Sequence, residues 1–104
     1  MGFRNGGGKW HAGDNKGTFG EPDRNKGVVP VDVGHGQMVE AKVGADFVNT
    51  VEAIARDANY GGYFRVFYAN DGAGSMTEVV NPGDAPAKIE AGMRIAITSY
   101  DKVG

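Results

Sequence analysis

The chain has 104 residues, of which 40% are hydrophobic, and this length and composition suit one small domain. It contains no cysteine, which excludes disulfides, thiolate zinc sites and cysteine nucleophiles and favours a reducing, cytoplasmic compartment. The net charge of −2 gives no reason to expect nucleic acid, and no apolar run approaches the roughly 18 residues of a membrane span.

The first 27 residues differ in composition from the rest. They hold eight of the eighteen glycines, interspersed with Asn, Asp and Lys, and carry five basic and three acidic side chains. Such a segment cannot bury enough apolar surface to offset about 1–2 kcal/mol of backbone entropy per residue. We therefore predict a flexible tail over 1–27 and a folded domain over 28–104.

A β-hairpin is predicted at the start of the domain. Residues 28–33 are mostly β-branched, residues 34–37 (Gly-His-Gly-Gln) are typical of a turn, and residues 38–43 alternate in polarity. Pro30 cannot donate to a ladder, so either the strand begins after it or a bulge lies there. The alternation places one set of side chains on the core face: Val39, Ala41 and Val43.

After Gly44 the period of the apolar residues changes to that of a helix, predicted over 46–60. Asp46 lies where an N-cap or a first-turn carboxylate is favourable, and Gly61-Gly62 supplies the stop. One stripe carries the apolar side chains: Phe47, Val48, Val51, Ile54, Ala55 and Ala58.

The rest of the chain predicts three strands. They cover 63–69, 76–80 and 93–100, with an irregular loop over 81–86. In the last strand, Met93, Ile95 and Ile97 are expected to point inward.

This order of elements, with a glycine at the chain end, resembles the β-grasp fold of ubiquitin and of the sulfur carriers of molybdopterin and thiamine synthesis. The nearest local match is the phrase over 87–97, AKIEAGMRIAI. The resemblance implies an α+β roll in which a mixed sheet of four or five strands packs on one helix. In those carriers an activating enzyme adenylates the terminal glycine carboxylate. The corresponding residue here is Gly104, although Val103 replaces the usual penultimate glycine.

No pattern in the chain predicts catalysis. The two histidines, His11 and His35, have no metal-ligand spacing, and the sequence around Lys9 fails the phosphate-loop pattern. Ser75 is not in a nucleophile elbow. We therefore expect no enzyme activity, no cofactor and no metal.

The strand periodicity does predict a candidate binding face. If the inward residues face the helix, the opposite face shows aromatic and arginine side chains, which are common at interface hot spots. Its members are Tyr63, Arg65, Phe67, Arg94, Ala96, Thr98 and Tyr100, with Lys42 beside them. In the alternative, the loop over 70–87 covers part of this face and makes Phe67 and Tyr63 a secondary core.

Two functions follow from these observations. In the first, the chain is a monomeric, non-covalent protein-interaction module that uses this face. In the second, it is a ubiquitin-like modifier or sulfur carrier activated at Gly104.

Overall fold

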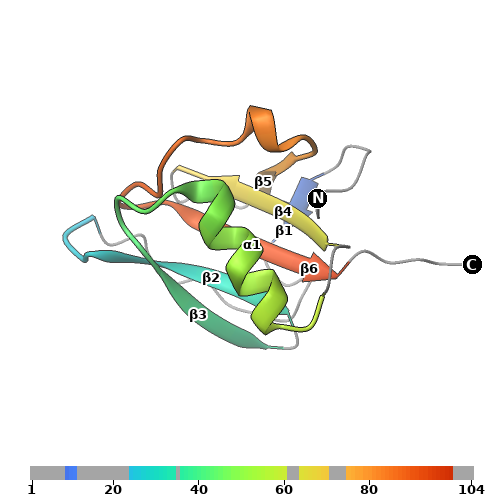
Figure 1. Cartoon of the computed structure of the whole chain (residues 1–104). Coiled ribbons are helices and arrows are strands. Elements are labelled where there is room, and N and C mark those ends of the chain that lie inside the picture. The colour runs from blue at the N-terminus through green and yellow to red at the C-terminus, as the bar shows by residue number, and fades with distance from the viewer. Residues whose placement is uncertain (1–8, 12–23, 35, 61–63, 71–74, 100–104) are drawn as a thin grey trace, which may run out of the picture.

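One mixed sheet carries an α-helix across one of its faces (Figure 1). The computed structural model describes residues 9–11, 24–34, 36–60, 64–70 and 75–99. The elements, in chain order, are β1 (Lys9–His11), β2 (Val28–Gly34), β3 (Gln37–Lys42), α1 (Phe47–Asp57), β4 (Phe64–Ala69), β5 (Ser75–Val79), the 3₁₀ turn η1 (Pro82–Asp84) and β6 (Arg94–Ser99). No helix in these residues is long and apolar enough to cross a bilayer.

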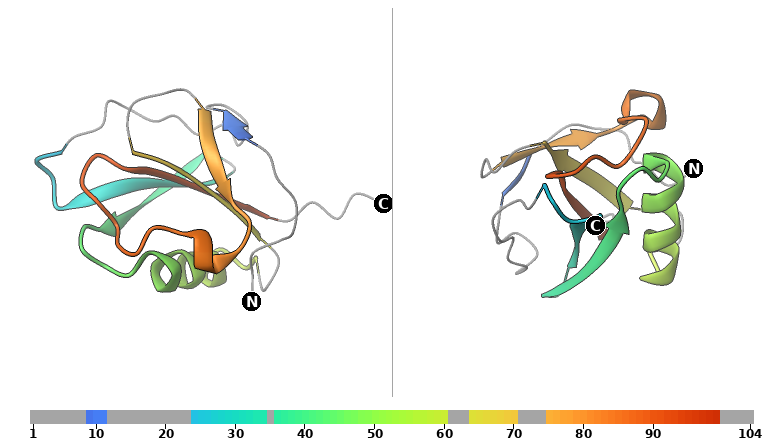
Figure 2. Two further views of the ribbon diagram at one scale, coloured as in Figure 1. Left: turned by 90° about the horizontal axis from the view of Figure 1, so that it is seen from above. Right: turned by 90° about the vertical axis from the view of Figure 1, so that its left-hand side faces the viewer.

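The strands lie in the order β1-β5-β4-β6-β2-β3. The last strand, β6, lies between β2 and β4; it is parallel to β2 and antiparallel to β4. Both views of Figure 2 show α1 on one side of this sheet. The predicted α+β class, with a mixed sheet and one helix, is confirmed for the described residues.

Part of the predicted N-terminal tail belongs to the sheet. Strand β1 extends it beyond β5, with Trp10 opposite Met76. The apolar content of the segment gave no sign of this strand, because backbone hydrogen bonds to an existing edge need no hydrophobic pattern. Most of residues 1–27 lie outside the described part of the chain.

The hairpin of β2 and β3 forms as predicted, with Gly34 and Gly36 at positive φ in its turn. Pro30 lies inside β2, opposite Glu40, and the register irregularity falls between Asp32 and Gly34 instead. The bond from Val43 N to the Gly27 carbonyl makes that pair hydrogen-bonded. By alternation, Pro30 and Glu40 form a non-hydrogen-bonded pair. The missing N–H of Pro30 therefore removes no hydrogen bond between β2 and β3.

Helix α1 starts as predicted and ends earlier. The Asp46 carboxylate accepts a hydrogen bond from Asn49 N at 2.9 Å and caps the helix. At the other end Asn59 has a φ of 66°, and Tyr60 N donates to the Ala55 carbonyl at 3.0 Å. With the bond from Asn59 N to Arg56 O, this is a Schellman motif. The left-handed Asn59 therefore ends the helix after Asp57, before the predicted stop at Gly61-Gly62. That pair lies outside the described residues.

The main core lies between α1 and the sheet. Phe47, Val51 and Ala55 are the buried residues of α1, and the predicted stripe is confirmed. They belong to a cluster with buried sheet and loop residues that include Val29, Val31, Phe64, Val66, Val79, Ile89, Met93, Ile95 and Ile97. The inward orientation predicted for the last strand is thus correct.

The Arg24 side chain forms a hydrogen bond to the segment that precedes β6. Its guanidinium donates to the carbonyls of Ala91 at 3.1 Å and Asn70 at 2.9 Å. Its side chain crosses Gly92, which has a φ of 82°, and a Cβ on Gly92 would meet it at 2.7 Å. Gly92 therefore meets two demands at once, a left-handed backbone and a close approach by Arg24.

We expect Gly92→Ala to lower the free energy of unfolding by about 1–3 kcal/mol, because alanine is strained at positive φ and crowds Arg24. The matched control is Gly83→Ala, since a Cβ at Gly83 meets nothing within 4 Å. Urea titrations of both variants measure the difference, and equal midpoints would contradict this account of Gly92.

Candidate functional site

The predicted binding face is buried at its centre. Phe67 is 1% exposed and packs with Met76 and Ala96 in a second cluster. Arg94 is 5% exposed. The predicted exposure of Phe67 and Arg94 is therefore wrong, and the alternative of a secondary core fits Phe67. The reason is that the sheet buries side chains on both faces, which one strand's alternation cannot show.

Of the other residues predicted on or beside this face, Lys42 is exposed and Thr98 half-buried. Arg65 forms an ion pair with Glu78 at 3.4 Å, and its guanidinium carbon lies 5.0 Å from the centroid of the Phe67 ring. The partly exposed Arg65 side chain is thus held by Glu78 over the Phe67 ring. Tyr63 and Tyr100 lie outside the described residues, as does Gly104.

Asp32 is a buried acid on the face of β2 that points away from α1. It is 0% exposed, and Oδ1 accepts a hydrogen bond from Gly34 N at 2.8 Å, while Oδ2 has no hydrogen-bond partner among the described residues. Burial raises the pKa of Asp32, and the bond from Gly34 opposes the rise. Burial, followed by the Asp32 charge, raises the pKa of Tyr60, whose hydroxyl donates to the Val33 carbonyl.

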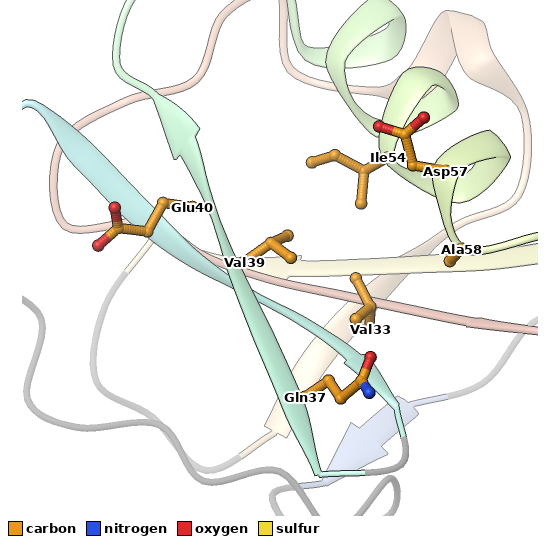
Figure 3. Close-up of a pocket in the computed structure, with 7 residues that line it drawn as sticks. All are labelled: Val33, Gln37, Val39, Glu40, Ile54, Asp57 and Ala58. Carbon is orange, nitrogen blue, oxygen red and sulfur yellow. The ribbon is translucent and has the colours of Figure 1, made fainter.

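Within the described residues, a hollow suited to contact with a partner lies between β3 and the C-terminal end of α1. It has a volume of about 290 Å³ and is lined by Val33, Gln37, Val39, Glu40, Ile54, Asp57 and Ala58. Figure 3 shows the side chains of Val33, Val39 and Ile54 directed toward one another across it. The floor is therefore aliphatic. We call this hollow the β3–α1 groove.

The groove exists because β3 lies at the edge of the sheet. Val39 points to the core face, as predicted, yet it is 38% exposed because α1 ends before covering it. Met38, on the opposite face of the same strand, is also 38% exposed. Among the described residues, no strand pairs with the outer edge of β3. An apolar hollow thus adjoins an open strand edge.

Two acidic residues line the groove, Glu40 and Asp57. Alternation places the Glu40 side chain on the face of β3 opposite to Val39, and Figure 3 shows its carboxylate directed away from Ile54. In the described part of the chain, neither acidic residue has an ion-pair partner. Asp57 is also the last residue of α1, where the helix macrodipole disfavours a negative charge. The position of Asp57 thus gives no stability to the helix that carries it.

Groups typical of a reaction centre are not gathered at this groove. The described residues hold no cluster of three or more His, Cys, Asp and Glu side chains that could bind a metal. The groove chemistry that remains is apolar contact, charge and backbone hydrogen bonding.

The sequence contained the residues of the groove but not their arrangement. Val39 and Ile54 were both assigned to core faces, and that assignment is correct in direction. The signal that could have revealed the groove was the place where the helix ends. Because the helix ends before Asn59, it does not cover Val39 on β3. Asn takes the left-handed conformation less often than Gly, so Gly61-Gly62 was the stronger signal in the sequence.

Comparison of the chain with protein-family models, with curated proteins and with solved structures finds no match.

Replacing Asp32 by Asn is expected to raise the thermal midpoint at pH 7 and to lose this gain in acid. The folded state binds a proton at Asp32 more tightly than the unfolded chain, because its pKa is raised from 3.8. Stability therefore falls as the pH rises from about 4 through the folded-state pKa, and Asn avoids that loss. In the variant, the pKa of Tyr60 should also move toward 10.0, as measured by NMR. A gain in midpoint that is constant from pH 3 to 8 would exclude this origin.

Neutralising Asp57 should stabilise the fold. We expect Asp57→Asn to raise the free energy of unfolding by about 0.3–1 kcal/mol at low ionic strength, because it removes a negative charge from the helix C-terminus. Asp46→Ala is the matched comparison at the other end and should lower it by about 1 kcal/mol through loss of the cap. Denaturant titrations measure both; a loss of stability in Asp57→Asn would show that Asp57 has a structural role.

Proposed function

We propose that this chain is a ubiquitin-like interaction module that binds an extended segment of another protein along the free edge of β3. One apolar side chain of that segment occupies the β3–α1 groove. The observation that carries the proposal is the open edge of β3 directly beside an aliphatic hollow.

The order of the strands supports the ubiquitin-like part of the proposal. A hairpin, a helix that crosses the sheet, and a last strand inserted parallel to the first strand of the hairpin resemble the plan of a β-grasp roll. Fold alone does not define function, so the binding mode rests on the site.

Backbone geometry makes the edge of β3 suitable for strand addition. The bond between Val43 and Gly27 sets the alternation, so the N–H and C=O groups of Met38, Glu40 and Lys42 point away from β2. An added strand gains main-chain hydrogen bonds from such an edge, and pockets for alternate side chains supply specificity. The groove beside Val39 is a pocket of this kind.

The burial of Phe67 and Arg94 moves the proposed interface from the sheet face to this edge. Val39 and Met38 are the exposed large hydrophobic side chains of the described residues, and both belong to β3. The partner class proposed from the sequence, another protein, is retained.

A random heptapeptide library displayed on phage tests the proposal. Selected peptides, titrated into ¹⁵N-labelled protein, should shift the amide signals of Met38, Glu40 and Lys42. Glu40→Pro should weaken their binding about tenfold or more, because proline removes an outward N–H that an added strand needs. The fold should survive, because proline is tolerated on edge strands.

The matched control is Glu40→Thr, which removes the same carboxylate and keeps the N–H. Deleting Gly104 should leave peptide binding unchanged, because this binding uses no C-terminal chemistry. Equal affinities for the Pro and Thr variants, or shifts confined to another surface, would exclude strand addition at β3.

A further inference from the structure

We propose that the segment bound along β3 is basic, with an aliphatic residue in the β3–α1 groove and Lys or Arg side chains opposite Glu40 and Asp57. This inference rests on the proposed function and defines the chemical class of its partner. The negative charges of Glu40 and Asp57 beside the groove are the basis of the inference.

Two acidic residues flank the aliphatic floor, Asp57 beside it and Glu40 on the opposite face of β3. Glu40 is exposed on β3 and Asp57 on α1, and no cation is among the residues that line the groove. Neither carboxylate has an ion-pair partner in the described part of the chain. A cation of the bound segment beside either residue would therefore meet a carboxylate that no ion pair of the described residues engages.

The end of α1 adds to this negative potential. Asp57 lies at the helix C-terminus, where the macrodipole attracts cations and repels anions. A Lys or Arg side chain placed there interacts favourably with both the helix and the carboxylate. An acidic side chain would be repelled by both.

Strand geometry gives the spacing of the motif. Side chains of an added strand alternate between faces and rise about 3.3 Å per residue. The residue that enters the groove lies on the Val39 face, and its neighbour in sequence lies on the opposite face, which carries Glu40. A basic residue two positions from the aliphatic one returns to the groove side and extends toward Asp57.

Lys42 fixes the register of this motif. It is exposed on the same face of β3 as Glu40, two residues further along. A basic side chain directly opposite Lys42 is disfavoured, whereas one opposite Glu40 is favoured. The bound segment therefore carries its positive charge beside Glu40 and a neutral or acidic residue beside Lys42.

The size of the groove agrees with an aliphatic side chain. Its volume of about 290 Å³ lies at the lower limit of the roughly 300–1,000 Å³ typical of small-molecule pockets. Val33, Val39, Ile54 and Ala58 offer methyl groups without a buried polar partner in the floor. Leu, Ile or Val fits this floor, and Gln37 adds a neutral amide at its edge.

The phage-displayed heptapeptide library again supplies the probe. We expect the peptides that shift the β3 amides to be enriched in Lys or Arg at positions one and two residues from an aliphatic residue. Each of Glu40→Gln and Asp57→Asn should weaken their binding about two- to fivefold at low salt. The loss should shrink as added salt screens the charges.

Asp84→Asn is the matched control, because Asp84 is an exposed acid on η1, away from the groove lining. It should leave binding unchanged. Peptides that bind at β3 without basic enrichment, and with equal affinity for the Gln and Asn variants, would overturn this inference while leaving strand addition intact. Library peptides that fail to shift β3 at all would overturn both.

A second copy of the chain is the other occupant that the test can reveal. Pairing of two β3 strands would appear as a concentration-dependent dimer in sedimentation, with Glu40→Pro monomeric. That result would overturn the assignment of a basic partner peptide. Sedimentation as a monomer at every concentration, together with basic peptides at β3, is the expected outcome.

Discussion

The insertion of β6 between β2 and β4 is the contact on which the rest of the molecule depends. β6 pairs in parallel with β2 at Val31–Ile95 and in antiparallel with β4 along its whole length. Ile95 and Ile97 then contribute to the cluster under α1, while Ala96 packs with Phe67 on the other face. One strand thus joins the hairpin to the second half of the sheet and contributes to both apolar clusters.

The groove follows from the same arrangement. Because β6 takes the centre, β3 is left at the margin of the sheet, and α1 reaches only part of its length. The Schellman motif at Asn59 then turns the chain away before a further helical turn could cover Val39. Tyr60, which follows, is held against the end of β2 by its bond to the Val33 carbonyl. The hollow therefore results from the edge position of β3 and the early end of α1. It requires no backbone strain at Val39.

Local patterns in the sequence were enough for α1, for the strands from β2 to β6 and for one face of the core, but not for β1. The alternation in the last strand and the stripe on the helix gave the correct inward residues, because burial against α1 follows the periods of strand and helix. The same patterns failed on the other side of the sheet. Asp32, Phe67, Glu78 and Arg94 occupy outward positions in their own strands and are nevertheless buried. Burial of these residues depends on neighbours far away in sequence, which single-strand periodicity does not contain. The groove required knowledge of which strand lies at the edge and where the helix stops.

The central position of the last strand also bears on how the chain acquires its structure. Val31 and Ile95 are neighbours in the sheet although about 64 positions separate them in the chain. Contacts of such long range slow folding, because the entropy cost of closing a large loop comes before the stabilising strand pairing. On the ribosome, the hairpin and α1 are complete long before β6 emerges. Until then β2 and β4 each keep an unpaired margin beside exposed apolar side chains, and during this interval a chaperone can recognise the nascent chain.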